Sequence, residues 1–233
     1  MPYPYKHLFF DLDHTLWDFE QNAHDCLLDI HEHFNLKALG VEDITLFCEK
    51  FSEANHHYWA LLEQKLITTD QLRRSRFKTA FANVGVEIEE SFGLEINDFF
   101  LQLLPNKKAL IEGAIAVLDY LKPNYQLHIL SNGYHELQTQ KMTSSGILHY
   151  FEEIITVDKA KALKPDKAIF DYALKCANAS VSSSLMIGDN YEADIKGAIN
   201  AEFYTVFYNP AQQKTVEKPT HDILKLTDMI HFL

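Results

Sequence analysis

The feature that most constrains the fold is a regular alternation of short apolar runs and helical patterns in the second half of the chain. Short apolar runs bounded by turn residues are typical of buried strands. Strands that alternate with helices form a parallel sheet covered by helices on both faces. The sequence therefore predicts an α/β fold. The predicted strands are 126–131, 153–157, 184–187 and 203–206, and the helices are 114–121, a segment through Leu137 and Met142, 166–176 and 192–201.

One more strand precedes this region and is separated from it by a long helical insert. The apolar run from His7 predicts a strand that ends at about Asp11. Helical spacing follows, and it predicts four helices with no strand among them, at 19–34, 44–62, 68–84 and 88–104. We expect one domain made of residues 1–16 and 106–233, and an inserted helical domain of residues 17–105. Because the insert leaves at the end of the first strand, we expect it to act as a lid.

The composition excludes several classes of function. The 233 residues carry a net charge of −12 with no basic block, which argues against binding of nucleic acid polymers. Three widely spaced cysteines without a C-x-x-C pair predict neither a disulfide framework nor a structural zinc site. No apolar stretch approaches the roughly 20 residues of a membrane span, and no secretory leader pattern is seen. We expect a cytoplasmic protein that does not bind membranes, as a monomer or a small homo-oligomer.

Two carboxylates, Asp11 and Asp13, end the first apolar run. In an open α/β sheet, ligands bind just beyond the carboxyl ends of the strands. Side chains two residues apart on an extended backbone point to the same side. Like charges held so close repel unless a cation or a shared proton compensates. A D-x-D pair alone is also typical of a turn, so its meaning depends on the groups that the rest of the chain supplies.

Three further polar clusters follow predicted strands. Ser131-Asn132-Gly133 offers a hydroxyl and backbone N–H groups, which can hold an anion. Lys164-Pro165 offers a cation to a phosphate or a carboxylate. Asp189 and Asp194, with Asn190 between them, offer the oxygen ligands that Mg²⁺ prefers. Each cluster alone is equally typical of a turn, an exposed lysine or an acidic helix N-terminus.

The order of the four clusters is more specific than any one of them. D-x-D-x-T, a strand ending in Ser, Lys-Pro, and Gly-Asp-Asn followed by Asp194 succeed one another along the chain. This set resembles the ordered motifs of the haloacid dehalogenase superfamily of phosphatases. The resemblance covers the whole chain and implies a Rossmann-like parallel sheet with the insert as a C1-type helical cap. It also implies Mg²⁺ as the cofactor and a small-molecule phosphate monoester as the substrate.

The resemblance assigns a role to each motif residue. Asp11 would be the nucleophile that forms an aspartyl-phosphate, and Asp13 the general acid and then the general base. Lys164 would stabilise charge on the phosphoryl group and on Asp11. Mg²⁺ would be held by Asp11, the backbone carbonyl of Asp13, and Asp189, with Asn190 and Asp194 supporting these groups. Because haloacid dehalogenases proper lack the second Asp, Asp13 favours phosphoryl transfer over dehalogenation.

Several stretches resemble a narrower branch, the YjjG-like pyrimidine 5'-nucleotidases. They are residues 9–19, 131–138 and 164–174, with shorter matches at 58–59 and 67–77. This resemblance implies nucleoside 5'-monophosphates as substrates. Lys161 stands where we expect a glycine, so the sequence leaves open whether Lys159 or Lys161 shares the role given to Lys164. The residues predicted to contact phosphate or substrate are Thr15, Trp17, Phe19, Arg76, Ser131, Asn132 and Gly133.

The predicted function is thus a Mg²⁺-dependent 5'-nucleotidase. Alternatives with the same fold remain open: a sugar-phosphate or phosphoglycolate phosphatase, a phosphosugar mutase, or a 2-haloacid dehalogenase. A binding protein that has lost catalysis is an alternative of another class, and the intact Asp11, Asp13, Lys164 and Asp189 argue against it.

Overall fold

The computed structural model describes residues 5–233, which form two compact units. One unit contains the chain up to Phe19 and from Lys108 onward. The other is the continuous segment Glu20–Lys107, whose ends lie within three residues of the insert expected at 17–105.

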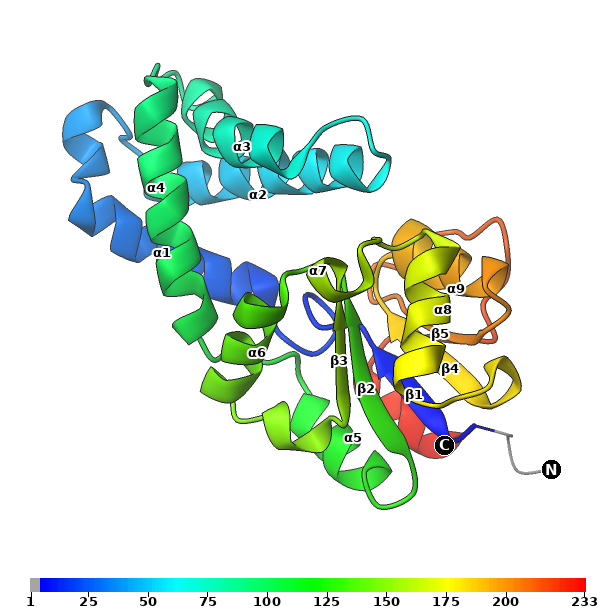
Figure 1. The fold of residues 1–233 in the computed structure, drawn as a ribbon. Coiled ribbons are helices and arrows are strands. Elements are labelled where there is room, and N and C mark those ends of the chain that lie inside the picture. The colour runs from blue at the N-terminus through cyan, green and yellow to red at the C-terminus, as the bar shows by residue number, and fades with distance from the viewer. Residues whose placement is uncertain (1–4) are drawn as a thin grey trace. The chain divides into compact units, whose positions relative to one another are not determined.

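The first unit is built on a six-stranded sheet in the order β3-β2-β1-β4-β5-β6 (Figure 1). All neighbouring strands pair in parallel, so the predicted α/β class with a parallel sheet is confirmed. The strands are β1 (His7–Phe10), β2 (Gln126–Ser131), β3 (Glu153–Thr156), β4 (Ser184–Gly188), β5 (Tyr204–Tyr208) and β6 (His221–Ile223).

Strand β1 occupies the centre of the sheet because it is apolar on both faces. Leu8, Phe9 and Phe10 are fully buried. Phe9 and Leu130 belong to the core beneath α8 (Lys167–Cys176) and α9 (Gly197–Asn200). In Figure 1, α5 (Ala114–Leu121) and α6 (His135–Ser144) flank the strands on one side and α8 flanks them on the other. Burial on both faces is what a central strand of a parallel sheet requires.

Two segments of this unit differ from the predicted pattern. The helix expected at 192–201 begins as a π-helical turn, η5 (Tyr191–Lys196), and continues as α9. The edge strand β6 was not predicted, since three residues carry too little periodicity to be recognised. The short helix α7 (Val157–Ala160) follows β3 directly.

The second unit contains most of α1 (Phe19–His33), together with α2 (Ile44–Glu63), α3 (Thr69–Asn83) and α4 (Glu90–Leu103). Thr68 and Gln71 form a capping box at the start of α3, in which each side chain accepts from the backbone N–H of the other residue. Apolar side chains from three helices form its core, among them Phe51, Phe77 and Phe100. None of the helices in residues 5–233 combines the length and the apolar character needed to cross a membrane.

Candidate active site

Four predicted polar clusters meet at the carboxyl edge of the sheet, because β2, β1 and β4 are neighbours there. Asp11 follows β1, Ser131 ends β2, and Asp189 follows β4. The Asp11 N–H donates to the Ile187 carbonyl at 2.8 Å, so the pairing of β1 with β4 continues up to the carboxylate. The backbone of Asp11 is therefore held by the sheet.

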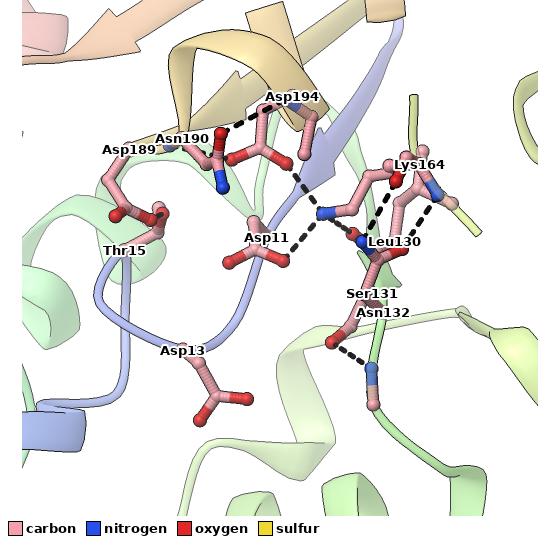
Figure 2. Close-up of polar contacts among 12 residues, drawn as sticks. Asp11, Asp13, Thr15, Leu130, Ser131, Asn132, Lys164, Asp189, Asn190 and Asp194 are labelled. Atoms are coloured by element: carbon pink, nitrogen blue, oxygen red, sulfur yellow. Dashed lines mark hydrogen bonds and ion pairs between the residues drawn. The ribbon is translucent and has the colours of Figure 1, made fainter. Parts of the chain in front are cut away.

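The Lys164 ammonium is the centre of the buried polar cluster (Figure 2). Its Nζ donates to Asp11 Oδ1 at 2.6 Å, to Asp194 Oδ1 at 2.6 Å and to the Leu130 carbonyl at 2.7 Å. An ammonium has three donors, so each of them has a partner. Although burial disfavours its charged form, Asp11 and Asp194 raise the pKa of Lys164. The lysine thus stays charged beside Asp11.

The Asn132 side chain fixes the backbone of Lys164, and the predicted contact of the Asn132 backbone with phosphate stays a prediction. Its Oδ1 accepts from the Lys164 N–H at 2.7 Å, and its Nδ2 donates to the Lys164 carbonyl at 3.0 Å. Of the three lysines considered, Lys164 places its ammonium against Asp11, whereas Lys159 and Lys161 are exposed at α7 and its end.

Asp189 is held by Thr15, whose hydroxyl donates to Asp189 Oδ1 at 2.9 Å. Thr15 is fully buried, so its predicted contact with phosphate is replaced by this contact with a carboxylate. Asp194 accepts from Lys164 through Oδ1 and from the Asn190 N–H through Oδ2. Gly188 makes this approach possible, because a Cβ there would lie 2.2 Å from Asp194 Oδ2.

The carboxylates form a site whose chemistry fits a divalent cation. Asp11, Asp189 and Asp194 each offer an oxygen, and these atoms lie within 4.8 Å of one another. Burial, with a contribution from Asp194, raises the pKa of Asp11 to about 7, although Lys164 opposes the shift. Burial, Asp194 and Asp11 also raise the pKa of Asp189. One lysine does not neutralise three clustered acids, of which Asp11 and Asp194 are buried and Asp189 is half-buried. A hard cation with oxygen ligands would neutralise them.

Asp13 has a separate set of partners. Its Oδ1 accepts from Lys141 Nζ at 2.6 Å, and its Oδ2 accepts from Gln138 Nε2 at 2.8 Å. Burial alone would raise its pKa, but Lys141 and Gln138 outweigh this effect and hold the pKa of Asp13 below its usual value. The two carboxylates of the D-x-D pair therefore lie in different electrostatic surroundings.

A family model described as haloacid dehalogenase-like hydrolase matches residues 5–202. The chain belongs to the haloacid dehalogenase-like hydrolases. This confirms the predicted family and the prediction of an enzyme that is a hydrolase.

Relatives and a solved structure cover nearly the whole hydrolase. Pyrimidine 5'-nucleotidase PynA of Streptococcus pneumoniae is 32% identical over 98% of the chain and 95% of its own length. Pyrimidine 5'-nucleotidase YjjG of Escherichia coli is 29% identical over 97% and 96%. The crystal structure of the putative HAD-hydrolase YfnB from Bacillus subtilis bound to magnesium has a TM-score of 0.86 at 26% identity, with 97% of each chain covered.

Ser131 and Gly133 of the hydrolase form a turn in which the serine oxygen accepts two hydrogen bonds. The donors are the Gly133 N–H at 3.1 Å and Gln138 Nε2 at 2.7 Å. A hydroxyl has two acceptor lone pairs and one donor hydrogen. With both lone pairs used, the Ser131 hydroxyl retains only its hydrogen for an anion.

Three residues predicted to contact substrate are buried instead. Trp17 is fully buried in the sheet unit, and Phe19 is 7% exposed. Arg76 lies inside the helical unit, where it donates to Asn97 Oδ1 at 2.9 Å and Asn55 Oδ1 at 3.0 Å. Buried rings cannot stack on a substrate base, and the buried guanidinium is not presented to a substrate. In this structure these residues pack the two units from within.

Sequence reasoning missed Gln138 and Lys141. They lie three residues apart on α6, so they share one face of that helix. Gln138 is 1% exposed and Lys141 is 6% exposed, and both face the site. The available signal was Lys141 next to the apolar Met142, on the helix that follows the Ser131 turn. It indicated that Lys141 could lie near the site. The spacing alone did not distinguish it from an exposed lysine.

Proposed function

We propose that this hydrolase is a Mg²⁺-dependent phosphatase that hydrolyses nucleoside 5'-monophosphates through an aspartyl-phosphate on Asp11. The observation that carries the proposal is the Lys164 ammonium, 2.6 Å from both Asp11 and Asp194 and buried with them. The ammonium holds the Asp11 carboxylate, the proposed nucleophile, in place at the end of the central strand. The names of the relatives PynA and YjjG support the choice of pyrimidine nucleotides within this class.

In the first half-reaction, an oxygen of Asp11 attacks phosphorus and the bond from phosphorus to the leaving oxygen breaks. Lys164 offsets negative charge on the phosphoryl group as it approaches a carboxylate. The hydroxyl of Ser131 donates to a phosphoryl oxygen, since its two acceptor positions are already used.

Asp13 serves both half-reactions as the proton carrier. In the first half-reaction the protonated form of Asp13 gives its proton to the leaving oxygen, because an alkoxide is a poor leaving group without a proton. The Asp13 carboxylate that remains is the form that Lys141 and Gln138 stabilise. In the second half-reaction it takes a proton from the water that attacks the aspartyl-phosphate. Asp11 and Asp13 thereby divide nucleophilic and proton-transfer work between them.

Asp11, Asp189 and the backbone carbonyl of Asp13 would hold the Mg²⁺ ion. When bound, the ion supplies positive charge that reduces repulsion between the incoming phosphate and the buried carboxylates. Thr15 orients Asp189 for this purpose, and Asp194 orients Lys164. In this proposal the helical unit Glu20–Lys107 is the cap that reads the part of the substrate beyond the phosphate.

A phosphate-release panel tests the proposal with purified protein and Mg²⁺. We expect the highest kcat/KM on pyrimidine nucleoside 5'-monophosphates, loss of turnover in Asp11→Asn, and inhibition by EDTA that Mg²⁺ reverses. Strong activity on hexose phosphates or phosphoglycolate with none on nucleotides would show that the proposed substrate class is wrong. The proposed mechanism would not be affected. An Asp11→Asn variant as active as the native enzyme would contradict the proposal that Asp11 is the nucleophile.

A further inference from the structure

Asp13 is directed away from the cluster around Lys164. Figure 2 shows its carboxylate turned from Asp11 and from the lysine. Attack on phosphorus is roughly in line, so the leaving oxygen lies on the side of the phosphorus opposite to Asp11. A proton donor for that oxygen therefore has to stand apart from the nucleophile, and something must hold it there.

Two side chains of α6 hold both oxygens of Asp13. Lys141 Nζ donates to Oδ1 at 2.6 Å and Gln138 Nε2 donates to Oδ2 at 2.8 Å. A carboxylate bound at both oxygens has its rotation fixed as well as its position. Lys141 is 128 positions from Asp13 in the sequence and Gln138 is 125 positions from it. Both bonds therefore depend on how α6 packs against the turn that follows β1.

Lys141 is itself held in place by an aromatic surface. Its Nζ lies 4.5 Å from the centroid of the Trp17 ring and 5.9 Å from that of Phe19. An ammonium over an aromatic face is attracted by the ring quadrupole, most strongly by tryptophan. The buried Trp17 and Phe19 rings therefore lie against the cation that pairs with Asp13.

Gln138 links the same carboxylate to the phosphate-binding turn. Its Nε2 donates to Ser131 Oγ at 2.7 Å as well as to Asp13. Gly133 leaves room for it, because a Cβ at that position would lie 2.5 Å from Gln138 Nε2. The orientation of Asp13 is therefore tied to the position of the hydroxyl that would bind the phosphoryl group.

We propose that Lys141 is a positioning residue which, seated on Trp17 and assisted by Gln138, orients Asp13 for proton transfer to the leaving oxygen. This role rests on the proposed phosphatase function. A buried lysine is unfavourable unless its charge is paired, and here the pairing is with the one carboxylate that would move protons.

The test compares esters that differ in their need for a proton. For an enzyme with a covalent intermediate, kcat/KM reports the steps up to release of the leaving group. Phenyl phosphate needs leaving-group protonation far more than p-nitrophenyl phosphate does. Because a general acid contributes about 10²- to 10⁴-fold, we expect Lys141→Met to lower kcat/KM for phenyl phosphate at least about tenfold more than for p-nitrophenyl phosphate. Lys141→Arg keeps the cation and should restore most of the loss.

Two further variants keep the test decisive. Asp13→Asn should show the same dependence on leaving group, and adding Lys141→Met to it should cause no further loss. Gln138→Leu carries no charge change and should show the same pattern more weakly, which covers the case in which Lys141→Met does not fold, as judged by circular dichroism.

Equal losses for both esters, or an undiminished further loss in the Asp13→Asn background, would overturn the role of Lys141 and leave the phosphatase proposal standing. A native enzyme that releases phosphate from none of the esters would overturn the phosphatase function, and this role with it.

Discussion

His7 and His128 lie side by side on the neighbouring strands β1 and β2, with His7 Nδ1 3.2 Å from His128 Nε2 and the two rings stacked. Both are buried, and Phe9 stacks on His128 as well. The pair shares one hydrogen at most along this contact, so protonation of both rings would place two buried cations together. Burial, with a smaller effect of His7, lowers the pKa of His128 to about 4, and burial lowers that of His7.

This pair predicts that the protein loses stability in mild acid. Below the ordinary histidine pKa of about 6.5, the unfolded chain binds a proton at residue 128 that the folded chain does not bind until about pH 4. The free energy of unfolding therefore falls as pH falls through this window, by about 3 kcal/mol for His128 at 1.4 kcal/mol per pKa unit. Urea denaturation between pH 7 and pH 4 measures it. In His128→Phe the slope should be smaller, and an unchanged slope would contradict the assignment.

Arg76 predicts a second outcome, which separates packing from substrate contact. Its guanidinium faces the Phe51, Phe77 and Phe100 rings at 5.0–5.8 Å, and burial lowers its pKa to about 9. Arg76→Ala should destabilise the protein by about 3 kcal/mol, because it leaves a cavity among these rings. Thermal unfolding measures this loss, and KM should stay unchanged where the variant is folded.

The neighbouring Arg73 provides the control for Arg76. It lies on the same helix with 40% of its side chain exposed and pairs with Asp98 at 2.7 Å. Arg73→Ala should change stability by less than about 1 kcal/mol, as is usual for exposed ion pairs. A raised KM with unchanged stability in Arg76→Ala would show that Arg76 contacts substrate rather than packing the helical unit.

Lys161 predicts a stabilising substitution. It adopts φ 56° and ψ 26° at the end of α7, in the left-handed region that glycine favours. Because a side chain there costs about 1–2 kcal/mol and glycine costs unfolded-state entropy, Lys161→Gly should stabilise by up to about 1 kcal/mol. Lys159→Gly, inside α7, should instead destabilise by about 0.5–1 kcal/mol. Melting temperatures of the two variants decide the matter, and a lower value for both would refute the strain at Lys161.

The cluster of Asp11, Asp189 and Asp194 predicts that Mg²⁺ raises the melting temperature in the absence of substrate. A ligand that binds only the folded state stabilises it by mass action, by about 2.7 kcal/mol at 100 times its Kd. In Asp189→Asn the response to Mg²⁺ should be much weaker, because one of the clustered carboxylates is lost. An equal response in both proteins would place the ion elsewhere. Asp171→Asn, an exposed acid on α8, serves as the control and should respond like the native chain.

The amino-acid sequence was enough to predict the architecture and the gathering of the candidate site residues at one edge of the sheet. Alternation of apolar runs with helical spacing allows one sheet class, since each strand must be buried on both faces. The carboxyl ends of neighbouring parallel strands lie at one edge, so Asp11, Ser131 and Asp189 had to meet there. Lys161 looked like a departure from the family pattern, yet the backbone keeps the left-handed turn that a glycine would adopt.

Which side chains contact the candidate site residues could be learned only from the tertiary structure. The partners of Asp13 come from α6, 125 and 128 positions along the chain, and no local pattern encodes such a distance. Arg76 was predicted to contact substrate and is buried among aromatic rings. Trp17 was predicted to contact substrate too, and its buried ring lies against the Lys141 ammonium. The physical reason is common to these cases. Burial and pairing of a charge depend on what packs against it from distant segments, and residue type and spacing do not specify that.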